Sequence, residues 1–317
     1  MDNKKWFKEA QFGMMIHFGL YSLIGGEWKG ESMNTIAEWA QSYFKIPNEE
    51  YHQLAKAFNP ICFDAEEWVK IAKEAGMKYI VVTTKHHDGF ALFGSEASNF
   101  NVVDATPFGR DIIKELAEAC RKYDMKLGLY YSQAIDWAHP DGFCARETLN
   151  AGMTWGNEWD YPDFDKKDYR RCFEEKIKPQ VREILTKYGD ICLVWFDTPF
   201  EYPSEYSEKL YNLVKSIQPD CLVNSRLGNG FCDYISADDN EIPNENNNGL
   251  YETPCTLNLT WGFKPADQNW KSADEVLKIK NHLNSRGINY LLNIGPDPLG
   301  RFPAKSIEIL KEVGKRV

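Results

Sequence analysis

The chain has 317 residues, of which 43% are hydrophobic and 26% are charged, a balance that is ordinary for a folded protein and excludes extended disorder. Its formal net charge is −10 and no run of Lys or Arg forms a basic stripe, so we expect no nucleic-acid partner. The eight cysteines are scattered without C-x-x-C pairs, which indicates neither a disulfide framework nor a zinc site.

The N-terminus runs directly from Met1 into sequence that is typical of a folded domain, and no apolar run resembles a signal peptide or a membrane span. We therefore expect no membrane partner. The direct interpretation is a cytoplasmic protein, with a periplasmic or secreted location as the alternative if a leader has been removed.

In chain order, apolar β-rich runs alternate with amphipathic stretches, which is the pattern of a parallel sheet covered by helices. The predicted helices span residues 64–75, 110–124, 167–187, 205–217, 272–285 and 304–315. The first of these has Asp64 as its N-cap and Glu67 three residues later. The predicted strands are Phe12–His17, Tyr79–Thr84, Leu127–Ser132, Cys192–Asp197, Cys221–Asn224 and Tyr290–Ile294.

Polar or ionisable side chains stand at the ends of most of these strands. The carboxyl ends of all strands meet at one face of a (β/α)8 barrel, so such residues would converge on one pocket. An open doubly wound sheet is the main alternative, but no Gly-rich phosphate-binding motif follows the early strands. We therefore predict one TIM-like barrel, irregular in its later helices. Residues 133–166 and 228–256 are predicted to be long loops of functional importance.

A carboxylate follows the strand that ends in Val194-Trp195-Phe196, and this residue, Asp197, could attack an anomeric carbon. An Asp in this position could equally cap a helix or form a turn. Retaining glycoside hydrolysis needs a second carboxyl group roughly 5–5.5 Å away. The loop 228–256 offers several, and the less polar neighbours of Glu252 would raise its pKa toward that of a general acid.

The other candidates could bind a sugar. The adjacent His86 and His87 could hydrogen-bond hydroxyls or act as structural residues; a metal is not expected, because no His-x-x-x-His or Cys/His spacing accompanies them. His17 could be a satisfied core histidine or a site residue. Glu38 beside Trp39 combines a carboxylate with a stacking ring, or is helix surface beside core.

Five motifs in order resemble the α-L-fucosidases of glycoside hydrolase family 29. They are residues 12–22 (Phe-Gly-Met-Met-Ile-His-Phe-Gly-Leu-Tyr-Ser), Tyr79 to Phe90 with its Thr-Lys-His-His block, Gly128-Leu129-Tyr130-Tyr131-Ser132, Trp195-Phe196-Asp197, and residues 290–296 (Tyr-Leu-Leu-Asn-Ile-Gly-Pro). The resemblance covers almost the whole chain. It implies a retaining exo-glycosidase that removes terminal α-L-fucosyl residues from fucosylated oligosaccharides or glycoconjugates and needs no cofactor or metal.

By this resemblance Asp197 matches the catalytic nucleophile. The positions that match the family's sugar-binding residues are His17, Glu38, Trp39, His86, His87, Tyr131, Trp195 and Arg226. Tyr130 is the alternative to Tyr131, because adjacent strand residues face opposite ways.

The resemblance is weaker at the acid/base. Many members of the family have a Thr-Pro-Glu after the Asp-Tyr pair that matches Asp233-Tyr234, whereas this chain has Ser236-Ala237-Asp238-Asp239-Asn240-Glu241. We therefore expect Glu252 to be the acid/base, with Glu241 as the alternative. The family's C-terminal β-sandwich is not found, so residues 1–317 are expected to form a single catalytic domain.

Two other functions remain open. The first is a carbohydrate-binding barrel that has lost catalysis, which would lack one of the two carboxylates. The second is a metal-dependent barrel hydrolase that uses His86, His87 and an Asp; a chelator would inactivate it.

Overall fold

Eight parallel strands form the sheet of a computed structural model that describes residues 3–143, 145, 149 and 152–317. In spatial order the sheet runs β7-β6-β5-β4-β1-β10-β9-β8. The strands are β1 (Phe12–Ile16), β4 (Tyr79–Lys85), β5 (Lys126–Tyr131), β6 (Leu193–Phe196), β7 (Leu222–Val223), β8 (Ile235–Ser236), β9 (Tyr251–Thr256) and β10 (Ile288–Ile294).

The two ends of this sheet meet. The backbone amides of Asp233 and Tyr234 donate to the Val223 carbonyl over 2.7 and 3.3 Å, and Asn224 and Tyr234 form a parallel bridge. The strand order therefore closes on itself, which confirms the predicted (β/α)8 barrel.

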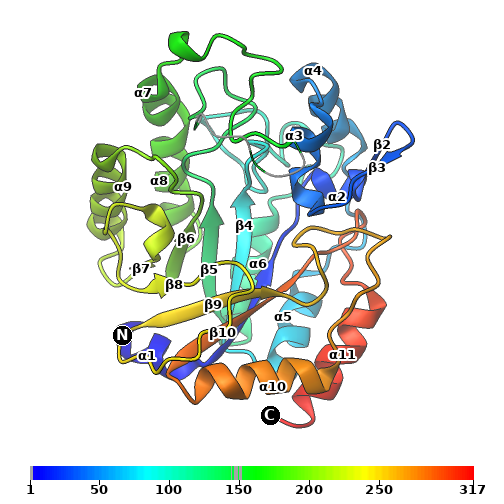
Figure 1. Ribbon diagram of the computed structural model, residues 1–317, viewed down its shortest axis with the longest axis vertical. Coiled ribbons are helices and arrows are strands. Elements are labelled where there is room, and N and C mark those ends of the chain that lie inside the picture. Colours follow the sequence, from blue (N-terminus) through cyan, green and yellow to red (C-terminus); the bar gives the residue numbers. More distant parts are fainter. Residues whose placement is uncertain (1–2, 144, 146–148, 150–151) are drawn as a thin grey trace.

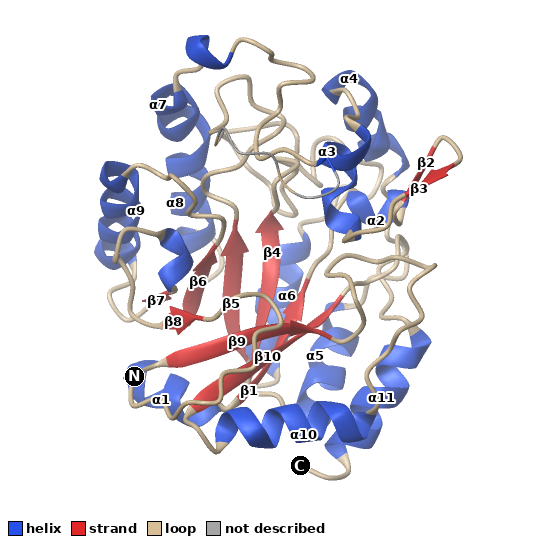
Figure 2. Ribbon diagram, in the orientation of Figure 1, coloured by secondary structure: helices blue, strands red, loops and turns tan. Residues whose placement is uncertain are grey.

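Most of the longer helices cover the outside of the barrel, whereas the first helix lies at the amino-terminal ends of the strands and contributes Phe7 and Ala10 to the inner core (Figures 1 and 2). The longer ones are α1 (Asn3–Ala10), α5 (Ala65–Glu74), α6 (Ile112–Lys122), α8 (Lys178–Thr186), α9 (Ser204–Ile217), α10 (Ala273–Asn284) and α11 (Ala304–Gly314). The short ones are α2 (Tyr21–Ile24), α3 (Ala40–Phe44), α4 (Asn48–Tyr51) and α7 (Tyr169–Cys172). A small antiparallel hairpin, β2 (Glu27–Trp28) and β3 (Glu31–Ser32), stands apart.

The predicted helices are present, and the predicted cap at Asp64 is formed. The Asp64 side chain accepts from the backbone amide of Glu67 over 3.0 Å. The predicted helix 167–187 is divided into α7, a π-helical turn over Phe173–Ile177 and α8. The described segment 222–256 holds no helix longer than the three-residue η6 (Ser225–Leu227), so the barrel is irregular in its later part, as predicted.

The prediction of a continuous loop over residues 228–256 is wrong, because this segment supplies β8 and β9. Strand β8 has two residues, too few to show a period in the sequence. Strand β9 contains Pro254, which normally indicates the absence of a strand. Strand β8 pairs only with Tyr251 and Glu252, so the missing amide of Pro254 does not interrupt that ladder. The other long loop, 133–166, includes residues outside those described.

Two apolar cores follow from the alternation of each strand. Tyr79, Val81 and Tyr130 point into the barrel, whereas Ile80 and Tyr131 point toward the helices. A side chain at Gly13 of β1 would collide with the ring of Tyr79, so this glycine lets the tyrosine cross the barrel interior.

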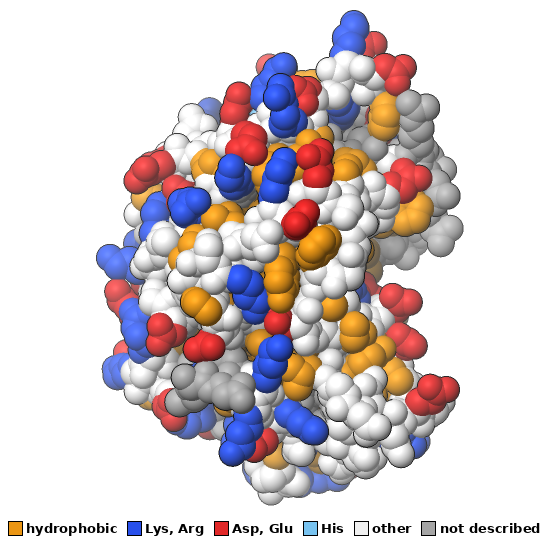
Figure 3. All heavy atoms as spheres, turned by 90° about the vertical axis from the view of Figure 1, so that its left-hand side faces the viewer, with side chains coloured by type: hydrophobic (Ala, Val, Ile, Leu, Met, Phe, Trp, Pro, Cys, Tyr) orange, Lys and Arg blue, Asp and Glu red, His pale blue; other side chains and the backbone are white. Residues whose placement is uncertain are grey.

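The surface is mixed in charge. On the face drawn in Figure 3, Lys and Arg side chains are interspersed with Asp and Glu rather than gathered in one stripe. None of the described helices is both long and apolar enough to cross a membrane. The described cysteines are free, and Cys144 lies outside the described residues.

Candidate active site

A cavity of about 600 Å³ lies at the carboxyl ends of the strands, the face where barrel enzymes carry their active sites. This volume is within the range of roughly 300–1,000 Å³ that is typical of small-molecule sites. The polar side chains of its wall are His17, Thr35, Glu38, His86, His87, Asp197, Thr198, Ser225, Arg226, Ser236, Asp238 and Asp239. The apolar ones are Met15, Ile36, Trp39, Leu149, Met153, Trp155, Trp195, Pro199 and Trp261.

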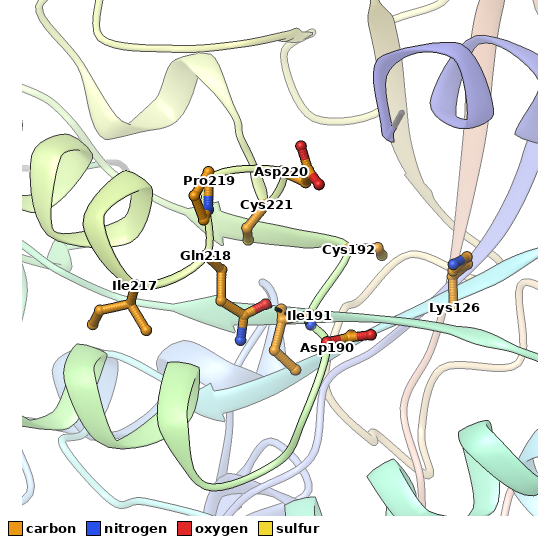
Figure 4. Close-up of a pocket in the computed structure, with 9 residues that line it drawn as sticks. All are labelled: Lys126, Asp190, Ile191, Cys192, Ile217, Gln218, Pro219, Asp220 and Cys221. Atoms are coloured by element: carbon orange, nitrogen blue, oxygen red, sulfur yellow. Dashed lines mark hydrogen bonds between the residues drawn. The ribbon is translucent and has the colours of Figure 1, made fainter. Parts of the chain in front are cut away.

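A second hollow lies at the opposite end of the barrel, where β5, β6 and β7 begin (Figure 4). Its wall includes Lys126, Asp190, Cys192, Gln218 and Cys221. The Gln218 amide is fully used: it accepts from the Ile191 backbone amide and donates to the Leu185 and Gly189 carbonyls. This end of a barrel serves stability, and none of the predicted site residues lies there.

Asp197 is held at the cavity wall by contacts to both carboxylate oxygens. The Tyr130 hydroxyl donates to Oδ2 over 2.9 Å, and Nη1 of Arg226 donates to Oδ1 over 3.1 Å. The Asp197 backbone amide donates to the Gln133 side chain over 2.8 Å, and Gln133 in turn donates to the Arg226 carbonyl. The carboxylate therefore has one fixed orientation, as a positioned nucleophile requires.

Arg226 also binds a second carboxylate. Its Nη2 donates to Asp239 Oδ1 over 2.7 Å and to the Ala237 carbonyl over 2.7 Å. One guanidinium thus bridges Asp197 and Asp239, both of which line the cavity. Arg226 thereby brings two carboxylates to one wall of the cavity, and retaining glycoside hydrolysis needs a pair of carboxyl groups.

Three imidazoles face the same cavity, and the rings of His86 and His87 are centred 4.0 Å apart. Burial lowers the pKa of His17 to about 4. Burial also lowers the pKa of His86 and His87 well below the usual value, helped by neighbouring positive charge. All three rings are therefore neutral at pH 7.

The hydrogen-bond network determines which nitrogen of two imidazoles carries the proton. Ser132 Oγ donates its one proton to the Ile135 carbonyl, so it can only accept from Nδ1 of His87, 2.7 Å away. The Asn293 amide donates to the Trp261 carbonyl, so its oxygen accepts from Nδ1 of His17, also at 2.7 Å. Both rings then present an unprotonated Nε2, which accepts a hydrogen bond from a donor such as a sugar hydroxyl.

Lys85, the lysine of the Thr-Lys-His-His block, is buried next to the cavity but does not line it. Lys85 is fully buried and donates to Asp136 over 3.0 Å and to the Ile135 carbonyl over 3.1 Å. Asp136 also pairs with the buried Lys176 at 2.8 Å. This network connects the last residue of β4 to the segment that follows β5. It therefore supports the two histidines that come directly after Lys85.

Tyr131, predicted to bind the sugar, faces away from the cavity. It packs in the outer core, and its hydroxyl donates to Gln180 on α8 over 2.8 Å. Its neighbour Tyr130 contacts Asp197 and stacks on His86 and Trp195. The prediction of Tyr131 is therefore wrong by one residue, and its alternative Tyr130 faces Asp197 instead. Adjacent residues of a strand point to opposite faces.

Glu252 also does not reach the cavity. It is 0% exposed in β9 and accepts from the Tyr79 hydroxyl over 2.5 Å and from Trp195 Nε1 over 3.0 Å. Burial raises its pKa to about 7, as predicted for a general acid, but Trp195 stands between it and the sugar site. Its alternative, Glu241, is exposed, absent from the cavity wall, and accepts from the Asp238 amide. The prediction that Glu252 or Glu241 faces the leaving group is therefore wrong, because neither side chain lines the cavity.

Glu38 and Trp39 reach the cavity from the short helix η1 (Ala37–Trp39). Glu38 accepts from the Gly262 amide over 2.9 Å, and burial raises its pKa to about 7. Its Oε1 is buried and has no hydrogen-bond partner among the described residues. Among the described residues, no three His, Cys, Asp or Glu side chains are grouped so that they could hold a metal ion.

The sequence analysis missed Asp239, Gln133, Asn293 and Trp155. The signal for Asn293 lay in the Leu-Leu-Asn-Ile-Gly-Pro motif at the end of β10, a strand-end position like those of the histidines. Asp239 could not be separated from the other acidic residues of its loop by composition.

The model of the family described as Alpha-L-fucosidase matches residues 1–317. The human plasma alpha-L-fucosidase is 30% identical over 98% of this chain and 66% of its own length. An alpha-L-fucosidase of Dictyostelium discoideum is 27% identical over 98% of this chain and 68% of its own length. The chain thus spans about two thirds of these relatives.

Solved structures agree with this assignment. Alpha-L-fucosidase AlfC from Lactobacillus casei, solved with its α-L-fucose product, is 54% identical with a TM-score of 0.96, over 99% of this chain and 98% of that one. The alpha-L-fucosidase of Vibrio sp. strain EJY3 is 36% identical with a TM-score of 0.91, over 99% of this chain and 54% of that one. The barrel with its paired carboxylates and histidine-lined cavity therefore belongs to a glycoside hydrolase of the α-L-fucosidase family.

Proposed function

We propose that this enzyme hydrolyses terminal α-L-fucosides by a retaining double displacement with Asp197 as nucleophile and Asp239 as acid/base. The observation that carries the proposal is the bridge formed by Arg226, which places these two carboxylates side by side at the wall of one sugar-sized cavity. Asp239 is favoured over Glu38 because only Asp239 shares the arginine that holds the nucleophile.

In the first step an oxygen of Asp197 attacks the anomeric carbon, while the glycosidic bond breaks and Asp239 gives its proton to the leaving oxygen. In the second step Asp239 takes a proton from water, the water oxygen attacks the same carbon, and the bond to Asp197 breaks. The neutral imidazoles of His17 and His87 accept hydrogen bonds from sugar hydroxyls during both steps, and Arg226 orients the two carboxylates.

The substrate class follows from similarity. Variants of AlfC have been solved with 4-nitrophenyl-α-L-fucopyranoside and with Fuc-α(1,6)-GlcNAc. At 53–54% identity, we infer that this enzyme also acts on fucose linked to N-acetylglucosamine in an oligosaccharide or glycoconjugate. That residues 1–317 act as one catalytic domain, and where in the cell they act, stay predictions.

The test is the stereochemistry of hydrolysis followed by proton NMR. Retention predicts that α-L-fucose forms first and then mutarotates, whereas early β-L-fucose would contradict the double displacement. Asp197→Ala is expected to lower kcat by a factor on the order of 10³ or more. Azide should restore turnover of this variant with β-L-fucosyl azide as product, because the small anion enters the space of the lost carboxylate.

The same assays separate the alternatives. A barrel that only binds carbohydrate would bind fucose without any turnover by the unmodified protein. A metal-dependent hydrolase would lose activity in excess chelator, whereas the proposed mechanism predicts unchanged rates.

A further inference from the structure

A continuous wall of aromatic rings runs from the histidines to the mouth of the cavity. Trp39 packs edge to face against His87, with ring centroids 4.9 Å apart. Trp155 packs edge to face against Trp39 at 5.7 Å. Phe200 then stacks on Trp155 at 5.8 Å, with the ring planes 14° apart.

The outer end of this wall is apolar and open. Trp155 is half-buried and lines the cavity, where Leu149, Met153 and Pro199 are its apolar neighbours on the wall. Phe200 is 40% exposed, one of few large apolar side chains so exposed among the described residues. An exposed aromatic stack beside a polar site has the character of a ligand-binding surface rather than of a core.

The loop that carries Phe200 is strained and anchored. Thr198 and Glu201 both have left-handed backbone, with φ of 55° and 53°, and this conformation is unfavourable for a β-branched threonine. The turn is held by the Tyr202 amide, which donates to the Pro199 carbonyl over 3.0 Å, and by Asn229, which donates to the Tyr202 carbonyl over 2.9 Å. Strain that the surroundings maintain is characteristic of functional sites.

This loop begins at the residue that follows the nucleophile. It therefore connects the position of Phe200 to that of Asp197, and Phe200 in turn stacks on the Trp155 ring. The cavity wall differs in burial along its length: the imidazoles of His17, His86 and His87 are buried, whereas Trp155 is half-buried and Phe200, which stacks on it, is exposed.

We infer that Trp155 forms the subsite for the leaving group and accepts the apolar face of a pyranose ring, and that Phe200 is a positioning residue for Trp155. The inference rests on the proposed function, because the fucosyl ring must occupy the inner end beside Asp197. A cavity of about 600 Å³ is of a size that holds drug-sized ligands, which are larger than one monosaccharide. The carbon–hydrogen face of a pyranose ring matches an aromatic surface, whereas a small polar leaving group would gain nothing there.

The test compares two substrates that differ only at the leaving group. Fuc-α(1,6)-GlcNAc places a sugar ring on Trp155, and α-L-fucosyl fluoride releases a single atom that reaches no ring. Trp155→Ala is expected to lower kcat/KM for the disaccharide by roughly tenfold and Phe200→Ala by roughly threefold, while the fluoride changes by less than about twofold. Phe200→Tyr, which keeps the ring, should behave as the unmodified enzyme.

Leu259→Ala is the matched control, since Leu259 is an apolar side chain that is 66% exposed and does not line the cavity. Equal losses on both substrates would overturn the inference, because Trp155 would then act through Trp39 on the fucosyl ring. Unchanged rates on both substrates would also overturn it. If the unmodified enzyme hydrolysed neither substrate, the proposed function itself would fail, a result distinct from a missing substrate selectivity.

Discussion

The Nη1 atom of Arg226 lies 3.1 Å from Oδ1 of Asp197, and the same guanidinium stacks over the Trp195 ring at 4.7 Å. The arginine is thus fixed by an aromatic face, while its two terminal nitrogens serve two different carboxylates. A planar fork can do this, whereas the ammonium of lysine is a single point charge.

Arg226→Lys is therefore expected to lower kcat by roughly tenfold to a hundredfold while keeping the positive charge. Steady-state kinetics on 4-nitrophenyl α-L-fucoside measures this. Arg121→Lys is the matched control, because Arg121 donates to the Tyr188 carbonyl and does not line the cavity. A rate close to that of the unmodified enzyme would show that charge alone suffices and that the bridge has no role.

Asp239→Ala should affect substrates according to their leaving groups. A poor leaving group such as N-acetylglucosamine needs the proton of the acid, so its turnover is expected to fall by roughly 10²-fold or more. The 4-nitrophenyl group leaves without a proton, and its release should fall much less. Asp238→Ala removes the neighbouring carboxylate of the same loop and is the matched control.

Glu252→Gln should not distinguish between the two leaving groups in this assay. Because Glu252 lies behind Trp195, its replacement should slow both substrates by a similar factor. A selective loss with the poor leaving group in Glu252→Gln, but not in Asp239→Ala, would return the acid/base role to Glu252.

Ser132 determines which ring nitrogen of His87 carries the proton. In Ser132→Ala the ring can carry its proton on either nitrogen, so Nε2 no longer has to accept from the sugar. A deoxyfluoro-fucose has a fluorine that cannot donate, so for one of the ring positions the unmodified enzyme should bind it roughly tenfold more weakly than fucose. Ser132→Ala should reduce that discrimination.

Inhibition constants for the deoxyfluoro series, with ¹⁵N NMR of the imidazoles, measure this effect. Ser207→Ala is the matched control, since Ser207 is buried and also donates to a backbone carbonyl, that of Leu227. If Ser132→Ala kept both the full discrimination and the Nδ1 proton, the assignment of the proton to Nδ1 by Ser132 would be wrong.

Glu252 should make stability depend on pH. Burial raises its pKa in the folded protein from 4.5 to about 7, so between these values the folded state binds more protons than the unfolded state. The free energy of unfolding therefore falls as pH rises from about 4.5 to about 7 and loses roughly 3 kcal/mol from this group.

Urea denaturation at a series of pH values tests this by comparison with Glu252→Gln, which cannot ionise. The difference between the two proteins should move in favour of the variant by that amount as the pH is raised. A difference that stays constant from pH 4 to pH 8 would show that Glu252 does not change its protonation in this range.

The sequence alone determined the barrel, the histidines and Asp197. Parallel strands bring their carboxyl ends to one face, so polar residues after the apolar runs at Tyr79–Thr84 and Cys192–Asp197 converge whatever the loops do. That inference needs only the strand ends, which apolar periodicity predicts well.

Only the tertiary structure decided the choice between neighbours. Tyr130 and Tyr131 are the same residue type on one strand, so the sequence does not show which of them faces Asp197. The register of β5 between β4 and β6 decides it. Glu252 and Asp239 differ by where β8 and β9 close the barrel: the first falls within a strand and points into the interior, and the second lies on the rim beside Arg226. Closure depends on contacts between distant segments, which no local pattern of residues contains.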